Sequence, residues 1–483
     1  MYEAGRGPIW TVPILYIVLP LLSRVAAAVG GTLIVPALLA VALDEWHMAS
    51  CFATVALATL AASAPGLRMP APRELRPSQA MVVSALGWLL AAFIGSLPYS
   101  LSGYMTPLDA YFESMAGFTT TGMTLLSDLE HLPRSLLLWR AFTQWLGGAG
   151  VILFMLLFVA PRGVGVWRLY VAEAREERLA VRAWDTVRNI WLIYAGYTAL
   201  CAVLLVAVGM SPFDAVCHSF TVLSTGGFST RTASIEAFRS PAIEAVLVAF
   251  MILGGMNFLV HSLLVRREFR RALTNAELRA MIAILAASIA VVSLDLMRRY
   301  DPLTSIRLAV FQATSIMTTT GYTTTDVNAL PSLSKAVLVT LMVVGGCLCS
   351  TAGAVKVARI AVLAKAAYRE VLKAILPPSA IKPLKVGGRV LEPDDALRVA
   401  GFFVAYMLMV AVATLLVAAE GHELTASLSA VLSAQGNVGP AYVSLFTLGP
   451  LAKVTLIMCM WAGRLELMPV LVLFTSRAWK ELF

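Results

Sequence analysis

Long apolar runs alternate with short polar segments along the whole 483-residue chain. Each run is at least about 17 residues long, which is enough for an α-helix to cross the hydrocarbon core of a bilayer. The runs lie at about 9–42, 48–64, 79–103, 136–160, 187–210, 241–265, 279–297, 333–364, 396–419 and 449–475. This pattern predicts ten spanning helices, and the first is expected to kink or tilt at its prolines, Pro13, Pro20 and Pro36.

A glycine-centred polar stretch separates the two long runs of a pair at four places along the chain. The four stretches read ESMAGFTTTGMT (113–124), HSFTVLSTGGFST (218–230), ATSIMTTTGYTTTD (313–326) and SAVLSAQGNVGPAY (429–442). The segment before each glycine is about ten residues long, which is too short to cross a membrane but suits a re-entrant half-helix. Long helix, half-helix, polar loop and long helix therefore form a unit that repeats four times in one orientation.

The repeated loops are expected to surround a pore. Non-helical backbone at membrane depth occurs only where protein buries it or where it lines a watery path. In a cation filter, rings of backbone carbonyls replace the hydration shell of the ion. Glycine permits the backbone conformations that turn successive carbonyls inward, and the negative C-terminal ends of half-helices favour cations. A simple Gly/Thr-rich turn explains one such loop, but not four in register.

The candidate ion-binding residues are the three at the centre of each loop. They are Thr120, Thr121 and Gly122; Thr225, Gly226 and Gly227; Thr319, Thr320 and Gly321; and Asn437, Val438 and Gly439. Threonine hydroxyls can either add oxygen ligands or brace the loop from behind. All of these ligands are neutral oxygens and no ring of carboxylates accompanies them, so K⁺ or Na⁺ is favoured over a divalent cation.

Composition and charge agree with a membrane protein. The chain is 59% hydrophobic and 13% charged, whereas about 25% of the residues of a soluble domain are charged. Most of its 37 Lys and Arg residues lie at 64–78, 161–186, 266–278, 365–395 and the chain ends. The positive-inside rule predicts that these segments and both termini face the cytoplasm, with the first helix retained as an anchor. Topology then explains the net charge of +9 without a nucleic-acid partner.

Residues suited to covalent or metal chemistry do not form a recognisable set. The six cysteines show neither a disulfide framework nor metal-site spacing, and Cys347 and Cys349 are interpreted as small packing residues. The five histidines are scattered, and His218 and His261 are interpreted as packing or helix-end residues. An intramembrane enzyme needs a nucleophile–base pair or a metal cluster, so the sequence predicts that the protein is not an enzyme.

Four further segments resemble the inner-helix motifs of the Trk/Ktr/HKT superfamily of potassium transporters. They read RAFTQWLGGAGV (140–151), LGGMNFLVH (253–261), GGCLCSTAGAVKVARI (345–360) and WAGRLEL (461–467). The resemblance covers nearly the whole chain and is closest to the Trk-type membrane subunit, which also has an extra N-terminal helix pair. It implies an all-α membrane fold with a helix pair at 1–64 and pore repeats at 79–160, 187–265, 279–364 and 396–475. The fourth loop, GNVGPAY, departs from the family pattern because it lacks threonine.

Two charged residues in the last two repeats are candidate gating residues. An arginine within a membrane helix is costly, and the resemblance implies that Arg464 projects into the pore below the filter. A buried pair with Glu466 is the alternative, although residues two apart on a helix point to different faces. Lys356 follows a Gly/Ser/Thr/Ala stretch that begins at Gly345 and Gly346, which the resemblance implies is an intramembrane gate loop. The alternative is a kink that only aids packing.

The sequence therefore predicts uptake of K⁺ across the cytoplasmic membrane, with K⁺ as transported ion and no bound cofactor. The resemblance implies a homodimer and a cytosolic nucleotide-binding regulatory subunit that docks on basic segments such as 266–279 and 365–385. A K⁺ symporter coupled to Na⁺ or H⁺ stays open as an alternative. A broken-helix secondary transporter is less favoured, because it predicts inverted halves whereas the four units here share one orientation.

Overall fold

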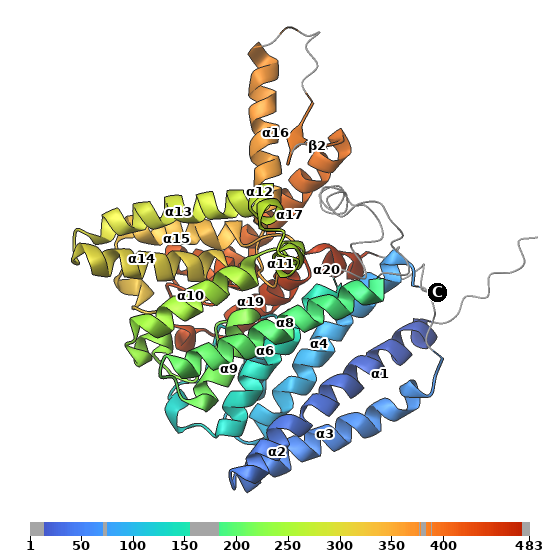
Figure 1. Ribbon diagram of the computed structural model, residues 1–483. Coiled ribbons are helices and arrows are strands. Elements are labelled where there is room, and N and C mark those ends of the chain that lie inside the picture. Colours follow the sequence, from blue (N-terminus) through green and yellow to red (C-terminus); the bar gives the residue numbers. More distant parts are fainter. Residues whose placement is uncertain are drawn as a thin grey trace, which may run out of the picture.

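The computed structural model describes residues 14–70, 75–154, 183–375, 377, 383–387 and 389–475. Its helices gather into one bundle, and α16 and the start of α17 project from one end of it (Figure 1). Within the described residues, strands occur only as the antiparallel pair β1 Lys385–Val386 and β2 Arg389–Val390. The predicted all-α fold class is therefore confirmed.

The N-terminal part forms two antiparallel segments that pack against the first repeat. The first segment consists of α1 Ile14–Thr32 and α2 Ile34–Ala42, and the second is α3 Trp46–Leu67. Helix α1 packs on both α3 and α4 (Figure 1). The two helices meet at Leu33, which keeps helical dihedrals of φ −64° and ψ −17°, and the predicted kink at the prolines stays a prediction. Pro36 lies in the first turn of α2, where a backbone N–H has no partner within the helix, so proline is tolerated there.

Four sets of helices follow, each with a long outer helix, a half-helix and an inner helix. The outer helices are α4 Pro77–Leu101, α8 Ala183–Ala207, α13 Ala276–Leu296 and α17 Pro393–Ala418. The half-helices are α5 Pro107–Phe118, α9 Pro212–Leu223, α14 Pro302–Met317 and α18 Leu424–Gly436. The inner helices are α6 Arg134–Phe154, α10 Pro241–Gly255, α15 Ser332–Val344 and α19 Pro450–Arg464. The division of the chain into units by the residue numbers given above stays a prediction.

Four further helices complete the last three sets. They are α11 Phe258–Val265, α12 Phe269–Thr274, α16 Val357–Ile375 and α20 Met468–Leu473. A single 3₁₀ turn lies between each filter loop and its inner helix, at Leu129–His131, Ser234–Phe238, Val327–Ala329 and Leu445–Thr447.

Local sequence explains where the half-helices begin. Three of them have a proline at their first position, which needs no N–H there and has the φ of a helix. The preceding Thr106, Ser211 and Asp301 each accept a hydrogen bond from the backbone N–H three residues later. Glu423 precedes the fourth half-helix and makes no such bond. These caps fix the N-terminal end of the first three half-helices.

Six described helices, not ten, are long and apolar enough to cross a membrane. They lie at Ile17–Ala42, Trp46–Leu67, Ser78–Leu101, Arg188–Ala207, Ala276–Leu296 and Asp394–Ala418. Three of the inner runs are interrupted within the described residues, whereas α6 is continuous from Arg134 to Phe154, so the number of ten spans stays a prediction. The run at 333–364, for example, contains α15, an irregular segment and the start of α16, and the break follows Gly345 at a φ of 73°. Hydropathy alone does not place this break, since the residues at its start, 345–349, are glycine, cysteine and leucine.

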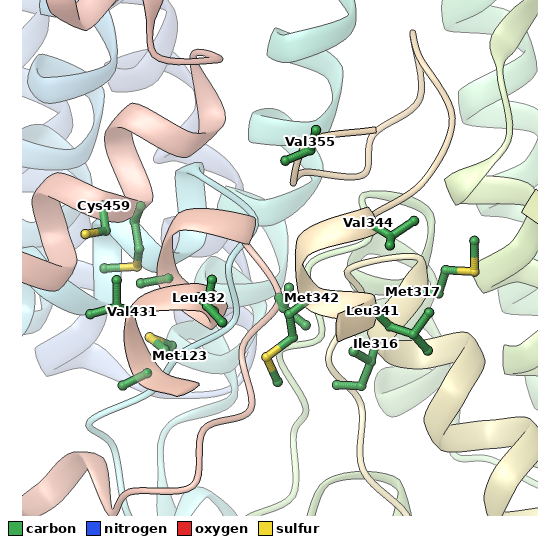
Figure 2. Packing of buried hydrophobic residues seen from close by; sticks show 14 of the residues in the cluster. Met123, Ile316, Met317, Leu341, Met342, Val344, Val355, Val431, Leu432 and Cys459 are labelled. Carbon is green, nitrogen blue, oxygen red and sulfur yellow. The ribbon is translucent and has the colours of Figure 1, made fainter. Parts of the chain in front are cut away.

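The interior that surrounds the loops is apolar. Figure 2 shows Ile316, Leu341 and Val344 of the third repeat on one side of Met342, and Val431 and Leu432 of the fourth on the other, with Met123 of the first loop below Val431. All of these side chains are buried. The six cysteines are also buried and form no disulfide, so the interpretation of Cys347 and Cys349 as packing residues agrees with the structure.

A carboxylate from another helix end caps the N-terminus of three inner helices. Asp295 lies in the last turn of the outer helix α13, and its carboxylate accepts a hydrogen bond from the first turn of α15. Glu420 follows the outer helix α17 and accepts hydrogen bonds from the start of α19. In the first repeat this carboxylate is Glu45, which lies between α2 and α3 and accepts from Arg134 N at 2.8 Å and Ser135 N at 3.1 Å. The N-terminal pair thus supplies an interaction that two other repeats obtain from their own outer helix.

We expect Glu45→Ala to lower the stability of the protein by about 1–2 kcal/mol, because it removes the cap of α6 and leaves two N–H groups without a partner. Thermal unfolding in detergent measures the effect. Glu423→Ala is the matched control, since Glu423 is exposed at a helix N-terminus and caps no backbone N–H. Equal unfolding temperatures for the two variants would show that the Glu45 contact does not stabilise the first repeat.

The candidate ion filter and gate

The four loops share one backbone conformation. In each, a residue with a left-handed φ stands two positions before a glycine whose φ is also positive. The first residues are Thr120, Thr225, Thr319 and Asn437, with φ of 52°, 53°, 56° and 54°. The glycines are Gly122, Gly227, Gly321 and Gly439, with φ of 79°, 76°, 81° and 111°. A positive φ is uncommon for threonine, so its recurrence at three equivalent positions shows that the loops are built to one pattern.

The N–H groups of the loops point back to the half-helices. In the first loop, Thr121 N and Gly122 N both donate to Ala116 O, at 2.9 and 3.3 Å. The second and third loops repeat this arrangement with Thr221 O and Ser315 O as acceptors. In the fourth, Val438 N donates to Ser433 O and Gly439 N to the Ser433 hydroxyl. Because the N–H groups are engaged on this side, the carbonyls are left to face away from the half-helices.

The loops close into a ring through their glycines. A Cβ added at Gly122 would lie far inside van der Waals distance of the carbonyl oxygen of Gly226, in the next loop. Gly227 meets Thr320 O and Gly321 meets Val438 O in the same way, and at Gly439 the Cβ would lie 2.8 Å from Thr121 O. The contacts therefore run from each loop to the next and return to the first. We call the oxygens of Thr121, Gly226, Thr320 and Val438 the carbonyl ring.

Several threonine side chains brace the loops. Thr119 and Thr121 share a hydroxyl–hydroxyl hydrogen bond of 2.8 Å, and Thr318 and Thr320 share another of the same length. The Asn437 amide donates to the Thr121 hydroxyl at 3.0 Å and so ties the fourth loop to the first. Of the two roles that the sequence left open for these hydroxyls, bracing from behind accounts for the contacts of Thr121 and Thr320.

An irregular segment, residues 345–356, lies against the second and third repeats. The Thr351 hydroxyl donates to Leu223 O and Gly254 O, both at 3.0 Å, and Gly353 N donates to the Thr319 hydroxyl at 2.8 Å. Tight packing explains its glycines, since a Cβ at Gly345 would lie 2.6 Å from Gly353 O and one at Gly346 2.9 Å from Gly255 O. Lys356 ends the segment, is buried, and donates to Ala352 O.

Arg464 joins this segment to the first inner helix. Its side chain is 3% exposed and donates to Thr351 O at 2.6 Å and Gly147 O at 3.1 Å. Arg464 is the last residue of α19 rather than a mid-helix residue, because Glu466 and Leu467 have positive φ and break the helix. The alternative pairing with Glu466 does not occur, since Glu466 forms an ion pair with Arg359 instead.

The four-loop ring and the broken inner helices match those expected of one transporter family. A family model described as TrkH, a cation transport protein, matches residues 47–480. The chain belongs to the TrkH family. The resemblance inferred from the inner-helix motifs is thereby confirmed.

Individual members of the TrkH family are similar over most of their length. The Trk system potassium uptake protein TrkH of Halomonas elongata is 37% identical over 425 residues, covering 85% of this chain and 88% of that protein. The protein of the same name from Escherichia coli K12 is 36% identical, covering 84% and 87%. The crystal structure of the potassium transporter TrkH from Vibrio parahaemolyticus is similar with a TM-score of 0.88 and 31% identity, covering 96% of this chain and 99% of that one.

A buried ion pair behind the first two filter loops was missed in the sequence. Arg140 and Glu113 are 1% and 0% exposed in their side chains and lie 2.9 Å apart. Glu113 also accepts from Leu125 N, and Arg140 donates to Ser229 O in the second loop. The hydrogen bond from Arg140 to Ser229 O therefore connects the first repeat to the second loop, and loss of either partner of the ion pair would leave the other charge buried and uncompensated. Its signal in the sequence was one acidic and one basic residue, each alone in an apolar segment of this TrkH-family chain.

Glu277 is a second residue that sequence reasoning missed. It lies in the first turn of α13, and its carboxylate accepts from Leu348 N at 2.6 Å and from the Asn257 amide at 3.2 Å. It therefore links an outer helix to the 345–356 segment and to the break that follows α10. His218 and His261 are buried and hydrogen-bonded within their own repeats, as packing residues would be. Among the described residues, no group of three or more His, Cys, Asp or Glu side chains could hold a metal ion.

Proposed function

We propose that the chain takes up K⁺ across the cytoplasmic membrane through a filter formed by its four loops. The residues proposed to bind K⁺ are Thr120, Thr121, Gly122, Thr225, Gly226, Gly227, Thr319, Thr320, Gly321, Asn437, Val438 and Gly439. The observation that carries the proposal is the closed carbonyl ring, in which each glycine contacts a carbonyl oxygen of the next loop. Membership of the TrkH family supports it, since close relatives are named potassium uptake proteins.

The chemistry of the ring suits a monovalent cation. A K⁺ ion that enters the filter loses water, and neutral carbonyl oxygens replace that water without binding the ion too tightly to release it. Each half-helix ends just before its loop, so its negative end adds a field that favours cations. The hydrogen bonds from loop N–H groups to the half-helices keep positive N–H dipoles turned away from the ion.

We propose that the 345–356 segment is the gate and that Arg464 holds it closed. Gly345 and Gly346 allow the segment to leave α15 and pack closely, and Lys356 ends it inside the protein. Arg464 donates hydrogen bonds to Thr351 O of the segment and to Gly147 O of α6, and so connects the two. Its charge is a second obstacle, because a cation that passes close to a guanidinium is repelled.

We further propose a homodimer in the lipid bilayer, with a nucleotide-binding regulatory subunit on the cytoplasmic side. The basic segments between the repeats support this orientation. The helix α16 follows the proposed gate directly and projects beyond the bundle, so a subunit bound there could move the gate (Figure 1). Charge of both signs lies on this helix, including Arg369, Glu370 and Lys373.

Flux measurements in liposomes test the proposed function. Purified protein is expected to carry K⁺ and Rb⁺ at least about tenfold faster than Na⁺ and Li⁺ under equal gradients, because a ring of carbonyls discriminates by ion size and hydration. Equal rates for all four ions would contradict a selective filter. Dependence of K⁺ flux on an imposed H⁺ or Na⁺ gradient, at fixed membrane potential, would favour the coupled symporter instead.

A further inference from the structure

The carbonyl ring contains one residue that departs from the pattern of the other three. Thr121, Thr320 and Val438 are β-branched and fully buried, whereas the second loop has Gly226 at this position. The backbone does not require glycine there, since Gly226 is not among the residues of positive φ. Space does require it, because a Cβ would lie 2.8 Å from Gln144 Nε2 and closer still to the rest of that amide.

Gln144 itself stands where the other inner helices have methionine. The motifs QWLGG, MILGG, MVVGG and MWAG align on their first glycine, and this places Gln144 with Met251, Met342 and Met460. All four side chains are buried. Three inner helices thus have methionine at this position, and three loops have a β-branched ring residue. Where the first inner helix meets the second loop, both residues differ, and glutamine contacts glycine.

Two hydrogen bonds connect Gln144 to the filter. Its amide nitrogen donates to Gly226 O at 2.7 Å, and its amide oxygen accepts from Phe228 N at 3.0 Å. The second bond fixes the orientation of the amide, because a backbone N–H can only donate. In the part of the chain that the structure describes, Gly226 O is the one oxygen of the carbonyl ring that accepts a hydrogen bond.

We propose that Gln144 is a positioning residue for ion selectivity, and this inference rests on the proposed function. Na⁺ is smaller than K⁺, so its coordination requires the ring oxygens to move toward the axis. A carbonyl oxygen that already accepts a hydrogen bond from an amide resists that movement, and the lone pair engaged by the amide weakens the field that the oxygen presents to a small ion. From the first inner helix, Gln144 thereby gives the second loop the bracing that side-chain packing and hydroxyl contacts provide in the other loops.

The test compares K⁺ and Na⁺ flux of Gln144→Met with wild type in liposomes at matched incorporation. We expect the K⁺/Na⁺ flux ratio to fall on the order of tenfold, because the variant loses the hydrogen bond to Gly226 O together with the one from Phe228 N, while K⁺ flux itself persists. The double variant Gln144→Met/Gly226→Thr should regain most of the ratio, because it recreates the pair formed by Met251 of the second inner helix and Thr320 of the third loop. The hydroxyl introduced at position 226 would lie two residues after Ser224, just as Thr320 lies two residues after Thr318. Gly226→Thr alone should lose flux, since Gln144 still fills the space.

Gln435→Met is the matched control, because Gln435 is equally buried but donates to Tyr406 O, outside the carbonyl ring. It should leave the ion ratio unchanged. An unaltered ratio in Gln144→Met, or an equal shift in Gln435→Met, would overturn the inference. If Gln144→Met fails to insert, Gln144→Asn removes the same contacts without adding atoms and must show the same fall. A wild-type protein without K⁺ preference would instead refute the proposed function, so the two failures are distinguishable.

Discussion

Serine in place of Gly227 is expected to lower the K⁺/Na⁺ flux ratio at least about tenfold. The Cβ would collide with the carbonyl oxygen of Thr320, which is backbone and belongs to the ring. Gly227 also has a φ of 76°, which costs a side-chain-bearing residue on the order of 1–3 kcal/mol. Each loop contacts the next around the ring, so displacement of the Thr320 oxygen shifts the third loop and disturbs the spacing of the other ring oxygens. Flux of K⁺ and Na⁺ in liposomes measures the change.

Two further substitutions make this result interpretable. Gly122→Ser should have a similar effect, since its Cβ would collide with Gly226 O in the same geometry. Gly196→Ser is the control, because Gly196 lies on α8 with no atom near its would-be Cβ and is exposed. Unchanged selectivity in both filter variants, with normal insertion and K⁺ flux, would rule out the carbonyl ring as the selectivity element.

Removal of the Arg464 side chain is expected to raise K⁺ flux at least about tenfold in the absence of any partner protein. The substitution Arg464→Ala deletes both hydrogen bonds that hold the 345–356 segment to α6. It also deletes a positive charge, which at about 4 Å repels a passing cation by about 4 kcal/mol at an effective dielectric of about 20. Flux of K⁺ in liposomes, at matched protein incorporation, measures the effect.

Lysine at the same position separates the two contributions of Arg464. Arg464→Lys keeps the charge but lacks the fork that donates to two carbonyls at once, so it should retain most of the barrier if charge dominates. Arg298→Ala is the control, because Arg298 is 80% exposed in its side chain and its ion pair is with Asp295, outside the 345–356 segment. Flux of Arg464→Ala at or below that of wild type would show that Arg464 is structural and not a barrier.

The repeat architecture was predictable because its signals are local. Each filter loop has its own glycine, three of the four half-helices their own N-terminal signal and each long helix its own apolar run, so neighbouring residues carry the information. The ends of the inner helices were not predictable, because the breaks at Gly345 and after Arg464 depend on close packing and on positive φ at residues such as Glu466. A hydropathy pattern does not distinguish small apolar residues that continue a helix from those that end it.

By itself the sequence determined a membrane protein with four pore loops in one orientation, and it identified the twelve residues at their centres as candidates. Only the tertiary structure decided how those loops meet. Gly122 contacts Gly226 from the next repeat, Gln144 reaches the same carbonyl, and Arg464 reaches Thr351 and Gly147. Such partners are 82 to 317 residues apart along the chain, and no local pattern encodes them. They exist because hydrogen bonds and van der Waals contacts act over a few ångströms in space, which only the packed bundle brings within range.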